Sequence, residues 1–382
     1  MHMTHDLRIA IVGAGPGGLV LANILDRHGV TATIFESDSS ATARAQGGVL
    51  DLHAEGGQYA MREAGLWEEF QRIARYDEQD FRVYNCRGEL EILQLTKPED
   101  FEVDRSRPET DRPQIRAVLL GGLPEGTVRW ERALQKIVQP DPVAPVSLRF
   151  RNGVVEEFDL VIGADGTWSR VRPLLSSTTP QYTGVTFFEM LHSNAAAVDP
   201  ANVALVGKGN MFALGERRAI NGHLTASGGV HVYAATMAEE PPARDALVRR
   251  DDVLALFSGW SPGLLRLLET AEPVAIPRPL WALPVGHSWE HRAGVTLLGD
   301  AAHVMSPFSG EGANLAMRDG ADLAHAILRG LQQGADLDQQ LRMYEADIQA
   351  RAAVAAEGAM RGLEEAFSED AIEHIREMFQ AH

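Results

Sequence analysis

Cysteine and positive charge are both scarce in this chain of 382 residues. The one cysteine, Cys86, has no second cysteine with which to form an internal disulfide, which suits a protein of a reducing compartment. We expect Cys86 to pack as a small apolar side chain. There are 35 Lys and Arg residues against 53 Asp and Glu residues, a formal net charge of -18. Because phosphate binding needs clustered cations, this balance argues against a nucleic-acid partner.

Long apolar runs are absent as well. No uninterrupted run reaches the ~18 residues expected of a membrane-spanning helix. The apolar stretch at residues 7–25 is broken by Gly and Pro, and it lacks the basic start and small-residue cleavage site of a signal peptide. We therefore predict a cytoplasmic protein with no membrane partner.

The length of the chain predicts two domains, or one domain that carries a large insertion. The chain is longer than one hydrophobic core usually serves. Residues 8–35 predict a strand, a glycine turn, a helix and a second strand, and Asn152-Gly153 between two alternating runs predicts a type I′ hairpin. Strand-like runs from Gly184 to Met237 predict an inserted β-sheet. Helix formers from about Leu337 to Phe367 predict a helix of about 45 Å, long enough to brace two domains.

A glycine pattern follows the first predicted strand. Gly13, Gly15 and Gly18 form G-x-G-x-x-G, in which the first glycine permits a tight turn, the second lets backbone approach a pyrophosphate, and the third lets helix and strand pack closely. Glu36 ends the second strand, where a carboxylate can accept hydrogen bonds from adenosine ribose hydroxyls. The pattern predicts a dinucleotide site without separating NAD from FAD, and a glycine turn used for packing alone is the alternative.

Two later segments place an acid after an apolar strand. DLVIGADG carries Asp165, a pattern that is also typical of an ordinary turn. LLGDAAHVMSPFSGEGAN carries Asp300, at the carboxyl end of a predicted strand, where open α/β sheets bind ligands. A helix start follows and offers unpaired N–H groups and a positive dipole. This second segment also carries Pro307, Gly310, Gly312 and Asn314.

In this order and spacing the three segments resemble those of the class A flavin-dependent monooxygenases, the aromatic hydroxylases with the p-hydroxybenzoate hydroxylase fold. The resemblance implies an α/β protein with a Rossmann-like FAD-binding domain, an inserted β-sheet substrate domain and a long C-terminal helix. The implied bounds are 1–75, 101–177 and 274–336 for the FAD-binding domain, 76–100 and 178–273 for the substrate-binding domain, and 337–382 for the bridging helix.

The resemblance also implies roles for the motif residues. The glycine pattern and Glu36 would bind the ADP part of FAD, and Asp165 would approach FAD and NAD(P)H. Asp300 would hold the ribityl chain. The backbone from Gly310 to Asn314 would cradle the pyrimidine edge of the flavin and stabilise negative charge on it.

Within that family, the segment RAQGGVLDLH and the segment around Asp300 are similar to those of the tetracycline-inactivating monooxygenases. This likeness implies that Arg44 and Arg112 contact FAD. A solvated charge at a helix start is the alternative for Arg112.

The same likeness implies a set of substrate contacts. It aligns Leu205, Met211 and Gly362 with three polar contacts of the tetracycline enzymes, and it aligns His231 and Phe308 with residues near the ligand. Because three polar side chains are missing, we expect either tetracycline or a flatter, less polar polycyclic molecule as substrate. A histidine that is hydrogen-bonded within the sheet is the alternative for His231.

The chemistry that the resemblance implies is carried by the cofactor. NADPH would reduce FAD, O₂ would add at flavin C4a, and the hydroperoxide would hydroxylate the substrate, so no catalytic side chain and no metal is expected in a protein that we expect to be a monomer. No second G-x-G-x-x-G follows a strand, so nicotinamide should bind transiently. The alternatives are a halogenase or reductase relative that does not hydroxylate, a flavin-containing protein that sequesters a drug, and an NAD-dependent dehydrogenase.

Overall fold

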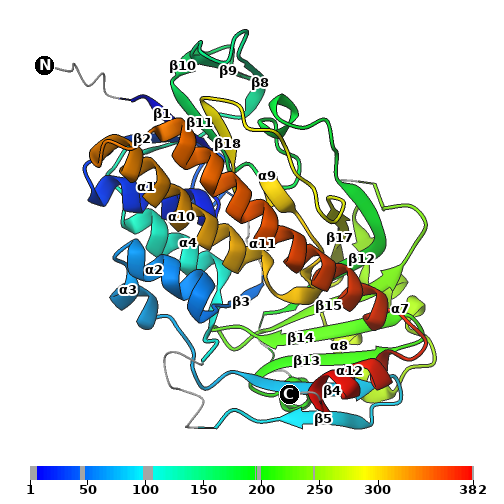
Figure 1. The fold of residues 1–382 in the computed structure, drawn as a ribbon. Coiled ribbons are helices and arrows are strands. Elements are labelled where there is room, and N and C mark those ends of the chain that lie inside the picture. The colour runs from blue at the N-terminus through cyan, green and yellow to red at the C-terminus, as the bar shows by residue number, and fades with distance from the viewer. Residues whose placement is uncertain are drawn as a thin grey trace, which may run out of the picture.

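The structure, a computed structural model, describes residues 7–43, 48–97, 106–193, 195, 199–243 and 246–380. Two large sheets lie at opposite ends of the molecule, and long helices run between them (Figure 1). This arrangement is the predicted α/β fold with an inserted sheet and a long C-terminal helix, and the fold prediction is confirmed.

A parallel sheet forms the first end of the molecule, with the strand order β18-β11-β1-β2-β7. Its strands are β1 (Ile9–Val12), β2 (Ala32–Phe35), β7 (Val128–Arg129), β11 (Leu160–Gly163) and β18 (Val295–Leu297). The apolar runs predicted as strands are fully or nearly fully buried, as expected for a parallel sheet that is covered on both faces. Because all five strands are parallel, their carboxyl ends meet at one edge.

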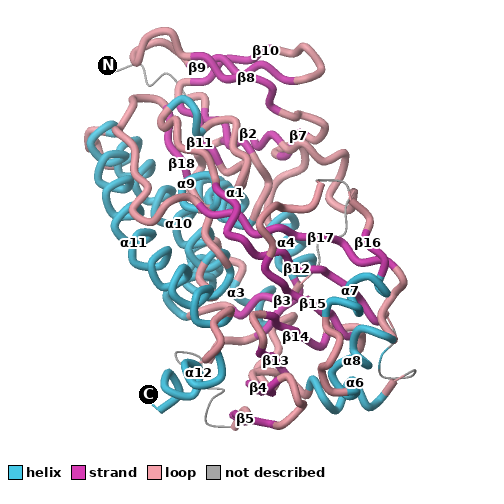
Figure 2. The backbone as a smooth tube through the Cα atoms, turned by 90° about the vertical axis from the view of Figure 1, so that its right-hand side faces the viewer, coloured by secondary structure: helices cyan, strands magenta, loops and turns pink. Residues whose placement is uncertain are grey.

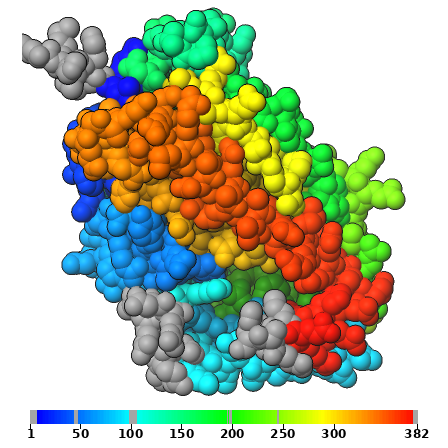
Figure 3. Space-filling view, viewed as in Figure 1, coloured from blue at the N-terminus to red at the C-terminus, as the bar shows by residue number. Residues whose placement is uncertain are grey.

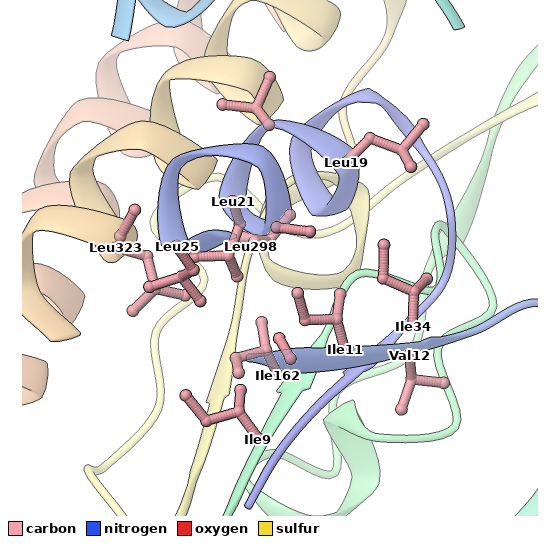
Figure 4. Packing of buried hydrophobic residues seen from close by; sticks show 14 of the residues in the cluster. Ile9, Ile11, Val12, Leu19, Leu21, Leu25, Ile34, Ile162, Leu298 and Leu323 are labelled. Carbon is pink, nitrogen blue, oxygen red and sulfur yellow. The ribbon is translucent and has the colours of Figure 1, made fainter. Parts of the chain in front are cut away.

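Helices cover one face of this sheet. They are α1 (Pro16–Arg27), α2 (Tyr59–Glu63), α3 (Trp67–Gln71), α4 (Arg112–Gly121) and α10 (Gly312–Gln332). Leu19, Leu21 and Leu25 of α1 belong to one buried apolar cluster with the β1 side chains, and Figure 4 shows Leu25 beside Leu323 of α10. α1 also lies against α10 at very short range, because a Cβ added at Gly17 would stand 2.3 Å from the carbonyl oxygen of Ala316.

A three-stranded antiparallel sheet covers the other face. Its strands are β8 (Leu134–Val138), β9 (Val146–Phe150) and β10 (Val155–Phe158), and Phe150 contacts Phe35 of the parallel sheet with ring centroids 4.7 Å apart. The predicted hairpin is confirmed, but its turn is not type I′. Gly153 has φ +84° whereas Asn152 has no positive φ, because a three-residue loop closed by Gly153 N–H and the Phe150 carbonyl (3.0 Å) needs one left-handed residue.

The eight-stranded sheet forms the other end of the molecule, with the order β16-β17-β12-β15-β14-β13-β4-β5. Its strands are β4 (Asp80–Asn85), β5 (Leu90–Gln94), β12 (Gln181–His192), β13 (Gly209–Gly215), β14 (Arg218–Leu224), β15 (Val230–Met237), β16 (Val248–Arg249) and β17 (Val274–Ala282). Figure 2 shows the long strands β12 and β17 rising from this sheet toward the parallel one. Three helices cover the face of this sheet that we call the helix-covered face: α6 (Pro200–Val206), α7 (Arg250–Leu256) and α8 (Pro262–Glu269).

The long helix α11 (Leu337–Ala366) connects the two ends and confirms the helix predicted over residues 337–367. Tyr344 packs in the core of the parallel sheet, whereas Leu363 packs with residues of the eight-stranded sheet. Figure 3 shows α10 and α11 as an orange band across this side of the molecule, with α12 (Ala371–Gln380) in red beyond it. α11 ends at Ala366, so the residues after it form a separate helix.

The remaining short elements lie between the two sheets. β3 (Val49–Asp51) pairs with β6 (Glu109–Asp111), and a π-helical turn spans Ala54–Gln58. α9 (Asp300–His303) and a 3₁₀ turn at Pro307–Ser309 follow β18, and a 3₁₀ turn at Arg172–Leu174 follows β11. Of the candidate site residues, these elements carry Asp300, Pro307 and Phe308.

Candidate functional site

In the loop between β1 and α1, Gly13 and Gly18 are closely packed, whereas Gly15 has open space beside it. Gly13 has φ +110°, donates its N–H to Phe35 (2.8 Å), and would place a Cβ 2.2 Å from the Ala164 carbonyl oxygen. A Cβ at Gly18 would stand 2.6 Å from the carbonyl oxygen of Gly13. At Gly15, by contrast, no atom lies closer than 4.0 Å. The first and third glycines are therefore needed for the turn itself, while the second leaves its backbone accessible, as a pyrophosphate site requires.

Glu36 lies at the carboxyl end of β2, beside this loop. Its carboxylate accepts the Ala14 N–H (2.9 Å), the Asp38 N–H (3.0 Å) and the Ser37 hydroxyl (2.9 Å). Burial opposes ionisation, but these donors outweigh it and lower the pKa of Glu36. The residue is therefore an anion at neutral pH, which suits an acceptor of ribose hydroxyls.

Arg116 is a buried cation beside the same loop that the sequence did not single out. Its Nε donates to the Ala14 carbonyl (3.3 Å), its guanidinium also donates to the Ala41 carbonyl (2.9 Å), and it lies 3.8 Å from Glu36. The helical spacing from Arg112 gave a weak signal, since positions i and i+4 share a face of α4.

Asp165 organises its own turn at the carboxyl end of β11. It accepts the Ser169 hydroxyl (2.6 Å) and the Arg170 N–H (2.6 Å), and burial raises its pKa. The buried Arg172 then ties this turn to the next motif by donating to the carbonyls of Thr167 (2.8 Å) and Ala301 (3.0 Å). The two motifs that the sequence separates by more than a hundred residues are thus one structural unit.

Asp300 begins α9 directly beyond β18. The residue keeps solvent-accessible surface, but the protein atoms packed around its carboxyl group desolvate it and raise its pKa. The positive charges of His303, Arg112 and Arg172 oppose that rise. A hydrogen bond with the Thr167 side chain also favours the ionised form, so the carboxylate is an acceptor at the tip of a strand, where open α/β sheets bind ligands.

A buried ion network fixes α9 in place. Asp319 of α10 accepts the Gly299 N–H (3.0 Å), bonds His303 Nε2 (2.6 Å) and accepts from Arg351 of α11 (2.9 Å). Burial alone would raise the pKa of Asp319, but His303 and Arg351 lower it. This network was not predicted, because its members come from three separate segments of the chain.

The segment after α9 presents open backbone. Pro307 begins a 3₁₀ turn, and Gly310 ends it in a left-handed conformation with φ +69°. At both Gly310 and Gly312 an added Cβ would meet no atom within 4 Å. The side chain of Asn314 is engaged elsewhere: it accepts the His53 N–H (2.9 Å) and donates to the Asp51 carbonyl (2.9 Å). The start of α10 therefore offers backbone rather than side chains to a ligand.

The two arginines assigned to FAD have different outcomes. Arg44 lies outside the described residues. Arg112 begins α4 and donates its N–H to the Gly48 carbonyl (3.1 Å). A Cβ at Gly48 would stand 3.6 Å from Arg112 Nε and 3.1 Å from the hydroxyl of Tyr233, so the two halves of the molecule meet at this loop.

His231 and Phe308 lie on the side of the eight-stranded sheet that looks toward the parallel sheet, here called the inner face. Phe187 joins them into an aromatic cluster: its ring centroid is 5.6 Å from Tyr233 and 6.0 Å from Phe308, and Tyr233 is 4.7 Å from His231. Glu189 hydrogen-bonds His231 Nε2 at 2.9 Å. The inner face thus combines aromatic rings with an imidazole.

Leu205 and Met211 are not on this face. Met211 is fully buried in the apolar cluster between the sheet and its covering helices, and Leu205 of α6 packs against the same cluster. Their neighbours in β13 alternate, so Asn210 and Phe212 point the other way. The structure separates these two positions from Phe308.

Gly362 contacts Phe308 directly. A Cβ at Gly362 would stand 3.0 Å from the Phe308 carbonyl oxygen, whereas at Gly358, one turn earlier in α11, it would meet nothing within 4 Å. Gly358→Ala is expected to raise the free energy of unfolding by about 0.5–1 kcal/mol, because Ala is the better helix former. Gly362→Ala should give no such gain, because Phe308 must move. Urea unfolding of both variants checks this; equal gains would contradict the contact.

Within the described ranges, no group of three or more His, Cys, Asp or Glu residues is arranged to hold a metal ion. No helix among the described residues is long and apolar enough to cross a membrane.

Comparisons with known proteins agree with this geometry. The sequence profile of the FAD binding domain family matches residues 6–219 and 287–359. The chain is 29% identical over 380 residues to monooxygenase asqM of Emericella nidulans, covering 85% of this chain and 84% of that protein. It is 31% identical over 353 residues to 3-amino-4-hydroxybenzoate 2-monooxygenase PtmB3 of Streptomyces platensis, covering 88% and 83%.

A solved structure shows the same fold. HpxO of Klebsiella pneumoniae, complexed with FAD and uric acid, has a TM-score of 0.80 and 21% sequence identity, covering 98% of this chain and 92% of that one.

Proposed function

The chain belongs to the FAD binding domain family and is an FAD-dependent monooxygenase, and from this premise we propose that it hydroxylates an aromatic or polycyclic small molecule with NAD(P)H as reductant. The observation that carries the proposal is that the motif residues of the parallel sheet face the aromatic cluster of the eight-stranded sheet. The carboxyl ends of β1, β2, β11 and β18 gather their motif residues at one edge of the parallel sheet, and the aromatic cluster on the inner face stands across from it.

FAD fits the residues at this edge. The open backbone at Gly15 and the anionic Glu36 suit the ADP part, with Arg116 as the nearby cation, and Arg112 supplies a cation near Asp300. Asp300 suits the ribityl hydroxyls, and the start of α10 suits the flavin edge. When bound, the flavin supplies activation of O₂; the protein positions both reactants and limits water.

The substrate class follows from the inner face. Phe187, Tyr233 and Phe308 offer ring surfaces, while His231 offers a polar contact. This combination suits a planar ring that bears a hydroxyl or amino group, and the relative named for 3-amino-4-hydroxybenzoate acts on such a ring. We leave Leu205 and Met211 out of the proposed contacts, and Gly362 enters through Phe308.

Tetracycline is the second candidate. The support for it is the sequence likeness around Asp300 and the retained His231 and Phe308. Neither of the two relatives described above is named for a tetracycline. We also propose the domain division given from the sequence, a monomer, and a cytoplasmic location with NADPH as the reductant.

A substrate screen tests the proposal. The purified protein should be yellow, and a substrate should stimulate its NADPH oxidation and appear in mass spectrometry with one added oxygen atom. NADH serves as the comparison reductant, and tetracycline is included beside phenols, aminophenols and polycyclic phenols. A protein that only sequesters its ligand would bind it and consume no NADPH. A halogenase would require halide, and a dehydrogenase would be colourless.

A further inference from the structure

Two histidines on the inner face each have a ring nitrogen without a partner. His223 of β14 and His231 of β15 stand directly opposite each other in the antiparallel register. In both rings Nδ1 is buried and has no hydrogen-bond partner among the described residues. A buried acceptor without a donor costs roughly 1–3 kcal/mol, so a pair of them calls for an explanation.

The other ring nitrogens show which way each imidazole is protonated. Asn221 donates its amide N–H to the Met211 carbonyl (3.1 Å), so its amide oxygen must accept from His223 Nε2 (2.5 Å). Glu189 is ionised, because His231 and Arg278 outweigh burial and lower its pKa, so it accepts from His231 Nε2 (2.9 Å). In the neutral form of each ring, hydrogen therefore lies on Nε2, and Nδ1 is an acceptor.

The charges around the pair favour this arrangement. Burial lowers the pKa of His223 to about 4, so this ring is neutral at neutral pH; Asp51 and Arg75 act on its pKa in opposite directions. Arg278 of β17, whose side chain is 50% exposed, donates to Glu189 (2.6 Å) and holds that carboxylate in place. Tyr233 lies beside His231, and its pKa is raised to about 12, so it stays a neutral hydroxyl.

The hydrogen bond from Glu189 fits a structural role for His231, but it leaves the two Nδ1 atoms unexplained. We infer that these two atoms form a receptor for two adjacent hydrogen-bond donors on the aromatic substrate, as in a catechol or an o-aminophenol, with Glu189 as the positioning residue. Directly opposed residues in a sheet have Cβ atoms about 5 Å apart, a spacing that two neighbouring ring substituents can bridge. Both side chains lie on the same face as Tyr233, whose hydroxyl reaches Gly48 at the flavin side. The inference rests on the proposed function and narrows its substrate class.

Three chromophoric probes test the receptor by binding alone. 4-Nitrocatechol carries two adjacent hydroxyls, 4-nitrophenol carries one, and nitrobenzene carries none. The flavin-loaded wild-type protein should bind them in that order, with each lost hydroxyl weakening binding roughly three- to tenfold. His223→Leu and His231→Leu, which remove the acceptor nitrogen, should each abolish one of these steps. Equal affinity of the three probes for the wild type, or failure to bind 4-nitrocatechol, overturns the inference.

A matched control and a second measurement keep the test decisive. His192→Leu makes the same substitution at a buried histidine of β12 that bonds the Leu267 carbonyl on the helix-covered face, and it should leave the probe order unchanged. ¹⁵N NMR of histidine-labelled wild-type holoprotein should show both rings with hydrogen on Nε2; hydrogen on either Nδ1 overturns the inference even if the variants fail to fold. Glu189→Gln should remove the fixed ring state of His231 and leave that of His223.

The binding test can fail without the proposed function failing, and the proposed function can fail without the binding test failing. The proposed monooxygenase function is contradicted if no screened aromatic molecule gains an oxygen atom. The order of probe affinities does not depend on turnover. A preserved probe order without product contradicts the proposed function and leaves the receptor standing. Product formation with no preference for the catechol supports the proposed function and contradicts the receptor.

Discussion

Replacing Asp300 by Ala is expected to yield a folded protein that loses most of its flavin during purification. The side chain stands at the tip of β18, exposed and encircled by His303, Arg112 and Arg172. A hydrogen bond to a charged group contributes about 1.5–3 kcal/mol, so losing a single ribityl contact should weaken FAD binding roughly ten- to a hundredfold. Flavin absorbance per protein, and titration of the apoprotein with FAD, measure the loss.

The control lies at the opposite edge of the same sheet. Asp159 precedes β11 and pairs with Arg8 on the surface at 2.7 Å. Asp159→Ala removes a carboxylate from the same sheet at the end that should not meet FAD, so flavin content should not change. If Asp300→Ala retained flavin as the wild type does, the assignment of Asp300 to the ribityl chain would be wrong.

The conservative variant Asp300→Asn should lower the affinity for FAD without lowering the stability of the apoprotein. Burial raises the pKa of Asp300 in the folded state. A raised carboxyl pKa means that the folded protein binds the proton more tightly than the unfolded chain does, so ionisation costs stability once the pH exceeds the unfolded pKa of about 3.9. At neutral pH the apoprotein of Asp300→Asn should therefore unfold at the same or a higher temperature than the wild-type apoprotein, although it binds FAD more weakly. A less stable apoprotein would indicate that Asp300 holds the fold.

The sequence predicted the parallel sheet and its ligand edge because both depend on local patterns. β1 and β11 are short apolar runs that end in glycine or acid, and parallel pairing then brings these ends together without further information. The long helix was equally visible, since Leu341, Tyr344 and Ile348 repeat at helical spacing and are all buried. Local periodicity was enough to place these elements, whereas the arrangement of the domains was implied by the resemblance to the class A flavin-dependent monooxygenases.

The substrate side was less predictable because strands alternate. An alignment without a structure placed Met211 at the ligand, but neighbouring residues of a strand point to opposite faces, so an error of one residue moves a side chain from one face to the other. Met211 faces the helix-covered core, and Asn210 of the same strand reaches Glu109 at 2.7 Å on the inner side. The local sequence of β13 does not indicate which of its two alternating sets of side chains points to the inner face.

The supporting networks were beyond local patterns altogether. Arg172 bonds Ala301 across 129 residues, and Arg351 bonds Asp319 across 32. Such partners are brought together by the packing of α9, α10 and α11 rather than by spacing. Sequence reasoning could name Asp300 as a candidate, but it could not say that Asp319 and His303 hold its helix in place.

The glycine loop offers the sharpest separation of fold from function. Gly13→Ala should destabilise the protein by about 2–5 kcal/mol, because Ala disfavours the left-handed backbone and its Cβ would collide with the Ala164 carbonyl oxygen at 2.2 Å. A native protein is stable by about 5–15 kcal/mol, so we expect a large fall in the unfolding temperature or loss of soluble protein.

Gly15→Ala should do the opposite. Gly15 has φ −78°, which Ala adopts readily, and no atom lies within 4.0 Å of the new methyl group, so the apoprotein should unfold as the wild type does. FAD binding should fall at least about tenfold, because the methyl group occupies the space in which backbone would approach the pyrophosphate. Thermal unfolding and FAD titration of the two apoproteins measure both effects. Wild-type FAD affinity in Gly15→Ala would mean that the space beside this glycine is not where the phosphates lie, since the backbone there is otherwise undisturbed.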